Sequence, residues 1–129
     1  MARQRGDRPD RLGLPAPGPR LDDIAYALRR FAPARNDDHA LDWHHFPDVP
    51  DRRARIRAFL DAHGDLPELD LPGFDLVEAM ARRVERTVAI GTALAERGIE
   101  PQRTWATEGH FEEEKAEAQW IRDHRALLE

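Results

Sequence analysis

The sequence predicts an all-α protein of about four helices that follow an irregular N-terminal arm. Apolar residues recur in steps of three and four along four segments, which is the period of a helix with one buried face. The apolar–polar alternation of a half-buried strand does not occur in the sequence. Proline and glycine stand between the periodic segments, where they end helices. A chain of 129 residues is expected to form one domain.

The N-terminal arm runs directly into the first helix. Residues 1–17 lack both periods and hold several glycines and prolines, so we expect an irregular, disordered arm. The first helix is predicted over residues 21–31, with Asp22 and Asp23 in its first turn, where carboxylates favour the helix dipole. Pro33 ends this helix. Its apolar face holds Leu21, Ile24, Ala25, Leu28 and Phe31.

A loop separates the first helix from the second. Residues 33–50 hold Asn, Asp and Pro around aromatic and histidine side chains, which indicates a loop with room for one short turn. The second helix is predicted over about residues 50–63, with Asp48 as candidate N-cap and Gly64 as the residue that ends it. Its buried face is expected to hold Ile56, Phe59, Leu60 and His63.

Two further helices complete the predicted fold. The third spans about residues 74–97 and ends at Gly98, with Glu78 and Arg82 as an i,i+4 pair on its exposed side. The fourth spans about residues 108–128. The buried face of the third helix holds Phe74, Val77, Met80, Ala81, Val84, Val88, Gly91 and Ala95. The face of the fourth holds Phe111, Ala118, Ile121 and Leu128, with Trp120 and Leu127 beside them.

Composition and charge exclude several classes of protein. Hydrophobic residues make up 40% and charged residues 35%, and no apolar run reaches the roughly 18 residues of a membrane span. The lack of cysteine removes disulfides and thiolate zinc sites and favours a cytoplasmic location. Residues 1–20 hold five arginines against two aspartates, so the rest of the chain carries 15 basic and 23 acidic residues, a net charge of −8. Such an acidic body is unsuited to binding nucleic acid.

The segment HGDLPELD, from His63 to Asp70, is similar to the catalytic loop of kinases. In that loop an aspartate accepts the proton of the substrate hydroxyl and an asparagine five residues later holds magnesium; Asp65 and Asp70 stand at these two places. An amphipathic helix precedes the segment, however, where the kinase loop follows a strand-like one. We therefore interpret His63 as the last core-facing residue of the second helix and Gly64 as its C-cap.

Two polar clusters have residue types that bind ligands. The first combines His39, Asp42, His44 and His45 with Asp37 and Asp38. A loop without the i,i+4 spacing of a helix gives no ligand geometry, so we predict a solvated loop anchored by Trp43 and Phe46 rather than a metal site. The second, Glu108–Glu117, could dock a cationic ligand or partner but is typical of a solvated helix face. Trp105 and Trp120 nearby are predicted to pack against this helix.

The segment PGPRLDDIAYALRRFAP resembles part of the aminoglycoside phosphotransferase and choline kinase-like family. There a metal-binding segment such as Ile-Asp-Trp-Asp runs into Gly-Asp-Pro-Leu-x-Asp-Leu-Ala and then into a helix. Pro19 and Arg20 replace the Asp-Pro pair of the family. The matching residues are Gly18, Leu21, Asp23 and Ala25. The later helices are also similar to the helical C-terminal part of that family, which makes residues 18–129 one helical subdomain after an arm over residues 1–17.

The resemblance implies the helical C-terminal subdomain of a protein-kinase-like fold. In the complete enzyme, ATP and Mg²⁺ lie between two lobes and the γ-phosphoryl group passes to a hydroxyl of a small molecule. The resemblance implies that Asp23 braces the backbone of the catalytic loop, although Asp23 is equally explained as a first-turn acidic residue. Several features of the family have no counterpart in this sequence: the Gly-rich strands, the ATP-contacting Lys, the catalytic loop and the metal-binding Asp. No catalytic, cofactor-binding or metal-binding residue is therefore assigned.

We therefore expect a C-terminal fragment of a small-molecule phosphotransferase that is inactive alone. Its expected partner is the missing N-terminal lobe, or another chain, which would cover its apolar face. Neither nucleic acid nor a membrane is expected as a partner. The codons of Pro9–Pro15, PDRLGLP, permit Leu-Ile-Asp-Trp-Asp-Phe when read one nucleotide later, which leads to the hypothesis that the gene is frameshifted. The alternative is a stand-alone helical protein-interaction module without catalysis.

Overall fold

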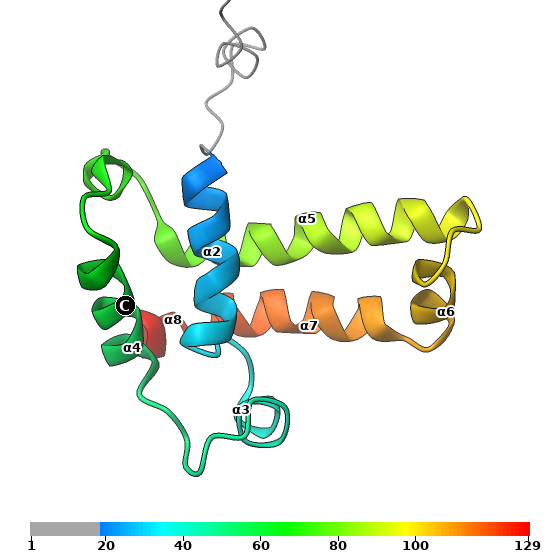
Figure 1. The fold of residues 1–129 in the computed structure, drawn as a ribbon, viewed down its shortest axis with the longest axis horizontal. Coiled ribbons are helices and arrows are strands. Elements are labelled where there is room, and N and C mark those ends of the chain that lie inside the picture. Colours follow the sequence, from blue (N-terminus) through cyan, green and yellow to red (C-terminus); the bar gives the residue numbers. More distant parts are fainter. Residues whose placement is uncertain (1–18) are drawn as a thin grey trace, which may run out of the picture.

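The computed structural model describes residues 19–129, and every regular element in this range is a helix (Figure 1). This part of the chain contains no strand, so the all-α prediction is confirmed. The arm predicted over residues 1–17 lies outside the described residues. Within the described range, the helices are too short or too polar to cross a bilayer.

A long antiparallel pair of helices, α5 (Leu76–Glu96) and α7 (His110–Asp123), dominates the fold. The short helix α6 (Gln102–Thr107) joins the two at one end (Figure 1). Helix α2 (Pro19–Phe31) crosses the other end of the pair and packs on α5. The apolar faces of α2, α5 and α7 are thereby turned toward one another.

The remaining helices gather around α2 and the C-terminal end of α7 (Figure 1). Helix α4 (Arg52–His63) packs against α2 and against the short α8 (Arg125–Leu128). Helix α3 (Asp37–Asp42) lies within residues 33–50, which were predicted to form a loop with room for one short turn. This short helix is that turn. The 3₁₀ helix η2 (Pro67–Asp70) connects α4 to α5.

Side-chain caps fix the starts of three helices. Asn36, Asp51 and Asp75 each accept a hydrogen bond from the backbone N–H three residues later, at 2.8, 3.0 and 3.1 Å. The predicted cap Asp48 is therefore wrong, because Asp51 takes that place and α4 begins slightly later. In the same way, Asp75 delays the start of the third predicted helix.

Glycines end two helices, as predicted. Gly64 follows α4 at φ +98° and Gly98 follows α5 at φ +77°, backbone conformations that L side chains rarely adopt. After α5, the amide of Gly98 donates to the carbonyl of Ala95 at 2.9 Å and the amide of Ile99 to that of Leu94 at 3.0 Å. These bonds satisfy carbonyls that the helix end leaves without partners.

The single fourth helix predicted over residues 108–128 is wrong, because the chain forms α7 and α8 there and α6 before them. The breaks fall at Gly109, with φ +83°, and at His124, with φ −110° and ψ 31°. The sequence gives no sign of α6, since none of its residues is buried and no apolar period arises.

The core is one continuous cluster shared by α2, α4, α5, α7 and α8. Its larger members include Leu28, Ile56, Val77, Met80, Val84, Ile121 and Leu128. Two residues predicted to face the core are exposed, Phe31 (40%) and His63. Both lie in the last turn of a helix at the edge of the core, where their rings lie 5.5 and 6.4 Å from the ring of Phe59.

Candidate functional site

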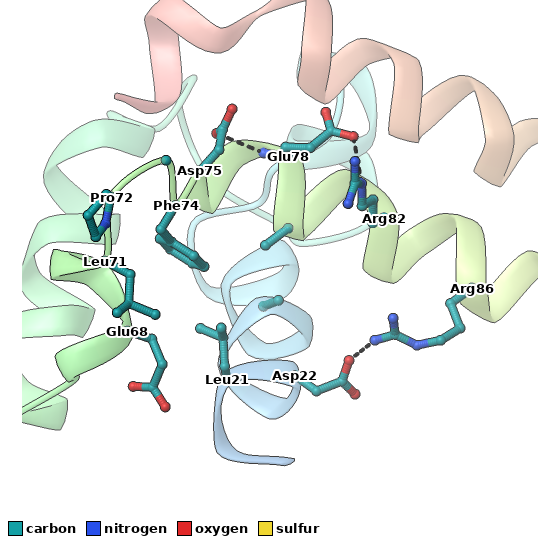
Figure 2. A pocket seen from close by; sticks show the side chains of 13 residues that line it. Leu21, Asp22, Glu68, Leu71, Pro72, Phe74, Asp75, Glu78, Arg82 and Arg86 are labelled. Atoms are coloured by element: carbon teal, nitrogen blue, oxygen red, sulfur yellow. Dashed lines mark hydrogen bonds and ion pairs between the residues drawn. The ribbon is translucent and has the colours of Figure 1, made fainter. Parts of the chain in front are cut away.

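A cavity of about 670 Å³ opens where α2 crosses the start of α5 (Figure 2). Its walls come from α2, from the first turns of α5 and from the segment between η2 and α5. The apolar lining residues are Leu21, Ala25, Leu71, Pro72, Phe74 and Ala79. The charged lining residues are Asp22, Glu68, Asp75, Glu78, Arg82 and Arg86.

The segment between η2 and α5 builds one wall of the cavity. Pro67 starts η2, where its fixed φ favours a helical turn. Gly73 then takes φ +77°, and the amide of Phe74 donates to the carbonyl of Leu71 at 3.0 Å. Figure 2 shows that this turn directs the ring of Phe74 toward α2, on which Leu21 lies. Leu71 remains 58% exposed at the cavity.

Arginines hold the two carboxylates of α5 at the cavity. Asp75 accepts a hydrogen bond from Arg125 at 2.7 Å, which lowers the pKa of Asp75. Glu78 accepts one from Arg122 at 2.8 Å and one from Arg82 at 3.0 Å, which together lower the pKa of Glu78. The predicted Glu78–Arg82 pair is therefore confirmed. Both carboxylates remain ionised at neutral pH.

A third carboxylate at the cavity belongs to α2. Asp22 forms ion pairs with two arginines of α5, with Arg83 at 3.1 Å and with Arg86. Figure 2 shows the pair with Arg86. Arginines thus hold these three carboxylates of the cavity, and the lowered pKa values of Asp75 and Glu78 make these two weak bases, so the arrangement is unsuited to proton abstraction. The cavity therefore combines an apolar lining with charged groups, which is the composition typical of sites for small polar molecules.

Asp23, the site residue implied by the resemblance, lies beside Asp22 on α2 but does not line the cavity. Its side chain is exposed and makes no hydrogen bond or ion pair with another described residue. The structure therefore places Asp23 at the surface, where a further protein segment could reach it. The bracing of a catalytic loop by Asp23 stays a prediction.

The histidine cluster is divided between different partners. The ring of His39 stacks on Trp43 with centroids 3.7 Å apart, whereas Nε2 of His44 lies 3.1 Å from Arg35. Residues 19–129 contain no group of three or more His, Cys, Asp or Glu that could hold a metal ion. The expected anchor Trp43 is 51% exposed, so it does not anchor the segment in the core. Its indole instead covers the guanidinium of Arg35, which lies 5.0 Å from the ring centroid.

The kinase-like segment HGDLPELD also lacks a functional arrangement among the described residues. Asp65 and Asp70 are both exposed, whereas Leu66 is buried in the core. Neither aspartate lines the cavity at α2. The segment therefore acts as a connection that anchors η2 through an apolar side chain.

A buried ion cluster is the feature that the sequence interpretation missed. The sequence pattern predicts Glu117 on the solvated face Glu108–Glu117, but in the structure Glu117 is 2% exposed. Its carboxylate accepts hydrogen bonds from Arg29 at 2.7 Å and from Nε of Arg35 at 2.8 Å. The sequence does contain a signal for the burial of Glu117, because this residue lies beside Ala118 on the apolar face of its helix.

The comparisons of this chain with family models, with curated proteins and with solved structures find no match. The resemblance implies ATP and Mg²⁺ for a complete enzyme. Mg²⁺ requires converging oxygen ligands, and residues 19–129 provide no cluster of side chains that could hold a metal. This part of the chain therefore does not fit the metal.

Proposed function

We propose that this chain is the C-terminal helical part of an ATP-dependent small-molecule phosphotransferase of the aminoglycoside phosphotransferase and choline kinase-like type. The observation that carries the proposal is the cavity at α2, because two residues that match the family motif, Leu21 and Ala25, line it. The chain is inactive alone, since catalytic and metal-binding residues must come from another lobe. A cytoplasmic location belongs to the same proposal and rests on the lack of cysteine.

In the proposed enzyme, the cavity forms one wall of the site for the hydroxyl-bearing acceptor. Its apolar lining contacts the carbon skeleton of the acceptor, and Asp75 and Glu78, which arginines already hold, offer their remaining oxygen lone pairs to polar groups of the acceptor. The exposed carboxylate of Asp23 accepts hydrogen bonds from the backbone of a catalytic loop supplied by the other lobe. ATP and Mg²⁺ are held by that lobe.

The DNA of the locus tests this proposal. We would determine the sequence from upstream of Met1 through Arg20 and translate all three forward frames. The proposal expects another frame to encode a His-x-Asp catalytic loop and an Asp-Trp-Asp segment over Pro9–Pro15. The repaired gene product should then consume ATP with a hydroxyl-bearing amine, whereas the present chain should not.

The same enzyme tests the proposed role of Asp23. Asp23→Asn in the repaired protein should lower kcat. The control is Asp61→Asn, which changes an exposed aspartate of α4 and should leave kcat unchanged. If no frame encodes a second lobe, or if the repaired product phosphorylates none of a panel of amino sugars, choline and sugars, the proposal is wrong.

A second candidate function, a stand-alone helical interaction module, is favoured by the continuous core that the described helices share. Large apolar side chains also remain at the surface, such as Leu71 (58% exposed) and Ile90 (57%). A module would associate through one defined interface, whereas a fragment would aggregate through surface that its missing lobe should cover. Sedimentation velocity at several concentrations separates the two, because a discrete dimer supports the module and heterogeneous aggregates support the fragment.

A further inference from the structure

A second cavity, of about 470 Å³, lies where α6 joins α5 to α7. This end of the α5–α7 pair is opposite the end that α2 crosses (Figure 1). The apolar lining residues are Ile90, Leu94, Trp105 and Phe111. The polar ones are Thr87, Gln102, His110 and Glu114. The two cavities share no lining residue, so they are separate sites.

We propose that this second cavity binds a small hydrophobic amine in its ammonium form, such as an arylalkylammonium ion. Ile90 is 57% exposed and Trp105 is 42% exposed, although Trp105 was expected to pack. These side chains offer aliphatic and aromatic surface to the carbon skeleton of a ligand. The indole of Trp105 also attracts a cation through the negative face of its ring.

Two side chains at this cavity, Gln102 and Glu114, carry hydrogen-bond acceptors with few or no close partners. The Oε1 atom of Gln102 is buried and has no hydrogen-bond partner in the described structure, which is costly for a polar atom. The carboxylate of Glu114 has a long contact of 3.5 Å with Arg29. The Glu114 carboxylate only accepts hydrogen bonds, so it favours an ammonium group over a carboxylate ligand, whereas the Gln102 amide has both a donor and an acceptor.

The other two polar residues of the lining already have partners. Oγ1 of Thr87 donates to the carbonyl of Arg83 at 3.2 Å. The imidazole of His110 lies 3.0 Å from the carboxylate of Glu108. The side-chain acceptor of the lining that remains open to a ligand is therefore the carboxylate of Glu114.

The charge around this cavity also favours a cation. Residues 96–117, which include α6 and the first part of α7, hold seven glutamates against three basic residues. Glu117 is neutralised by buried arginines, but the others raise the local concentration of cations. The acidic stretch that the sequence marked as a possible dock for a cationic ligand thus lies beside a cavity that fits one.

Isothermal titration calorimetry with 2-phenylethylammonium tests the proposal on the full chain at neutral pH. Neutral 2-phenylethanol and anionic phenylacetate serve as matched ligands with the same ring. We expect saturable binding of one ammonium ion per chain, with affinity at least roughly fivefold above that of either matched ligand. Trp105→Ala and Glu114→Gln should each weaken ammonium binding by at least roughly fivefold.

Trp43→Ala is the control variant, because Trp43 is an exposed tryptophan outside both cavities. It should leave the affinity unchanged, and circular dichroism melts should show that each variant folds. Equal binding of the ammonium ion and the alcohol overturns the proposal. So does a lack of saturable binding in the millimolar range, or unchanged affinity in both Trp105→Ala and Glu114→Gln. None of these outcomes bears on the proposed phosphotransferase function, which depends on the other cavity.

Discussion

Glu117 supplies the negative charge for two arginines in the interior of the protein. Arg29 is 6% exposed and Arg35 is 9% exposed, and both guanidinium groups donate to the Glu117 carboxylate. A buried charge is tolerated where it has a partner and hydrogen bonds. The cluster therefore fixes α7 against α2 and against the segment that follows α2.

We expect Glu117→Gln to lower the free energy of unfolding by about 3–5 kcal/mol, because an amide removes the main counter-charge of two buried guanidinium groups. Urea unfolding followed by circular dichroism measures this loss. Glu113→Gln is the matched control, since Glu113 is exposed on the same helix and its change should stay within about 0.5 kcal/mol. Similar losses in the two variants would show that the buried cluster is not important for stability.

His44 makes stability depend on pH near neutrality. Burial, and then the charge of Arg35, lower the pKa of His44 in the folded protein. Arg30 and Arg29 act in the same direction, and Glu117 opposes them. Between this lowered pKa and the ordinary value of about 6.5, the unfolded chain binds more protons than the folded one. The contribution of His44 is therefore complete above about pH 6.5 and is lost as the pH falls through the folded pKa.

We accordingly expect the free energy of unfolding to fall as the pH is lowered from about 7 to about 5.5. His44→Gln should flatten this part of the profile, since the variant has no proton to bind there. His63→Gln, which changes an exposed histidine, should keep the slope of the parent. Urea unfolding at a series of pH values gives the profiles, and a slope that survives in His44→Gln would assign the effect to another group.

At the scale of elements, α5 and α7 approach one another closely at Gly91. A Cβ atom built on Gly91 would lie 2.6 Å from Cε1 and Cζ of Phe111. We expect Gly91→Ala to destabilise the fold by about 1–3 kcal/mol, despite the better helix propensity of alanine. In Gly91→Ala/Phe111→Leu the smaller side chain makes room, so the double-mutant cycle should show favourable coupling. A stabilised Gly91→Ala variant would mean that the ring of Phe111 moves freely.

Asp75 has two roles at the start of α5, which substitution can separate. It caps the helix through the amide of Glu78 and pairs with Arg125. Asp75→Ser keeps a capping oxygen without the charge, whereas Asp75→Ala removes both, so the alanine variant should be about 1 kcal/mol less stable than the serine variant. Thermal unfolding provides the comparison. The same pair of substitutions at Asp51, the cap of α4, calibrates the cap alone, and equal stability of serine and alanine at Asp75 would contradict its role as a cap.

The helices that could be predicted from sequence are those that bury one face. α2, α4 and α5 carry apolar residues at helical spacing, so local periodicity is sufficient to find them. The exposed α6 leaves no such pattern. The choice between Asp48 and Asp51 as the cap of α4 cannot be made locally either, because both are the same residue type and tertiary packing decides where the helix begins.

At the scale of the whole molecule, the sequence motif supplies part of the candidate site, although Asp23, the residue to which the resemblance gives a role, does not line it. Residues Leu21, Asp22 and Ala25 stand in the motif that the sequence singles out, and all three line the cavity at α2. The rest of the lining comes from distant segments, such as the turn before α5. The Glu117–Arg29 contact joins residues 88 positions apart, and a pattern confined to one helix carries no information about such a partner.

The C-terminal helices are tied to α5 by arginines, and these ion pairs should make the molecule sensitive to acid. Arg122 donates to Glu78 at 2.8 Å and to Glu85 at 2.7 Å, and these hydrogen bonds lower the pKa of both carboxyls. A carboxyl with a lowered pKa contributes stability above its unfolded pKa, near pH 4, and this contribution is lost as the pH falls through the folded value.

Arg122→Met should therefore be less stable than the parent at neutral pH, and the difference should shrink below about pH 4 as the carboxyls become protonated in both proteins. The size of the effect is moderated by solvent, because Glu85 and Arg122 are partly exposed. Arg103→Met, which removes an exposed arginine beside Glu100, is the control and should match the parent at every pH. Urea unfolding at about pH 7 and about pH 3 measures the difference. If Arg122→Met loses as much stability in acid as at neutral pH, its aliphatic packing rather than its ion pairs holds α7 to α5.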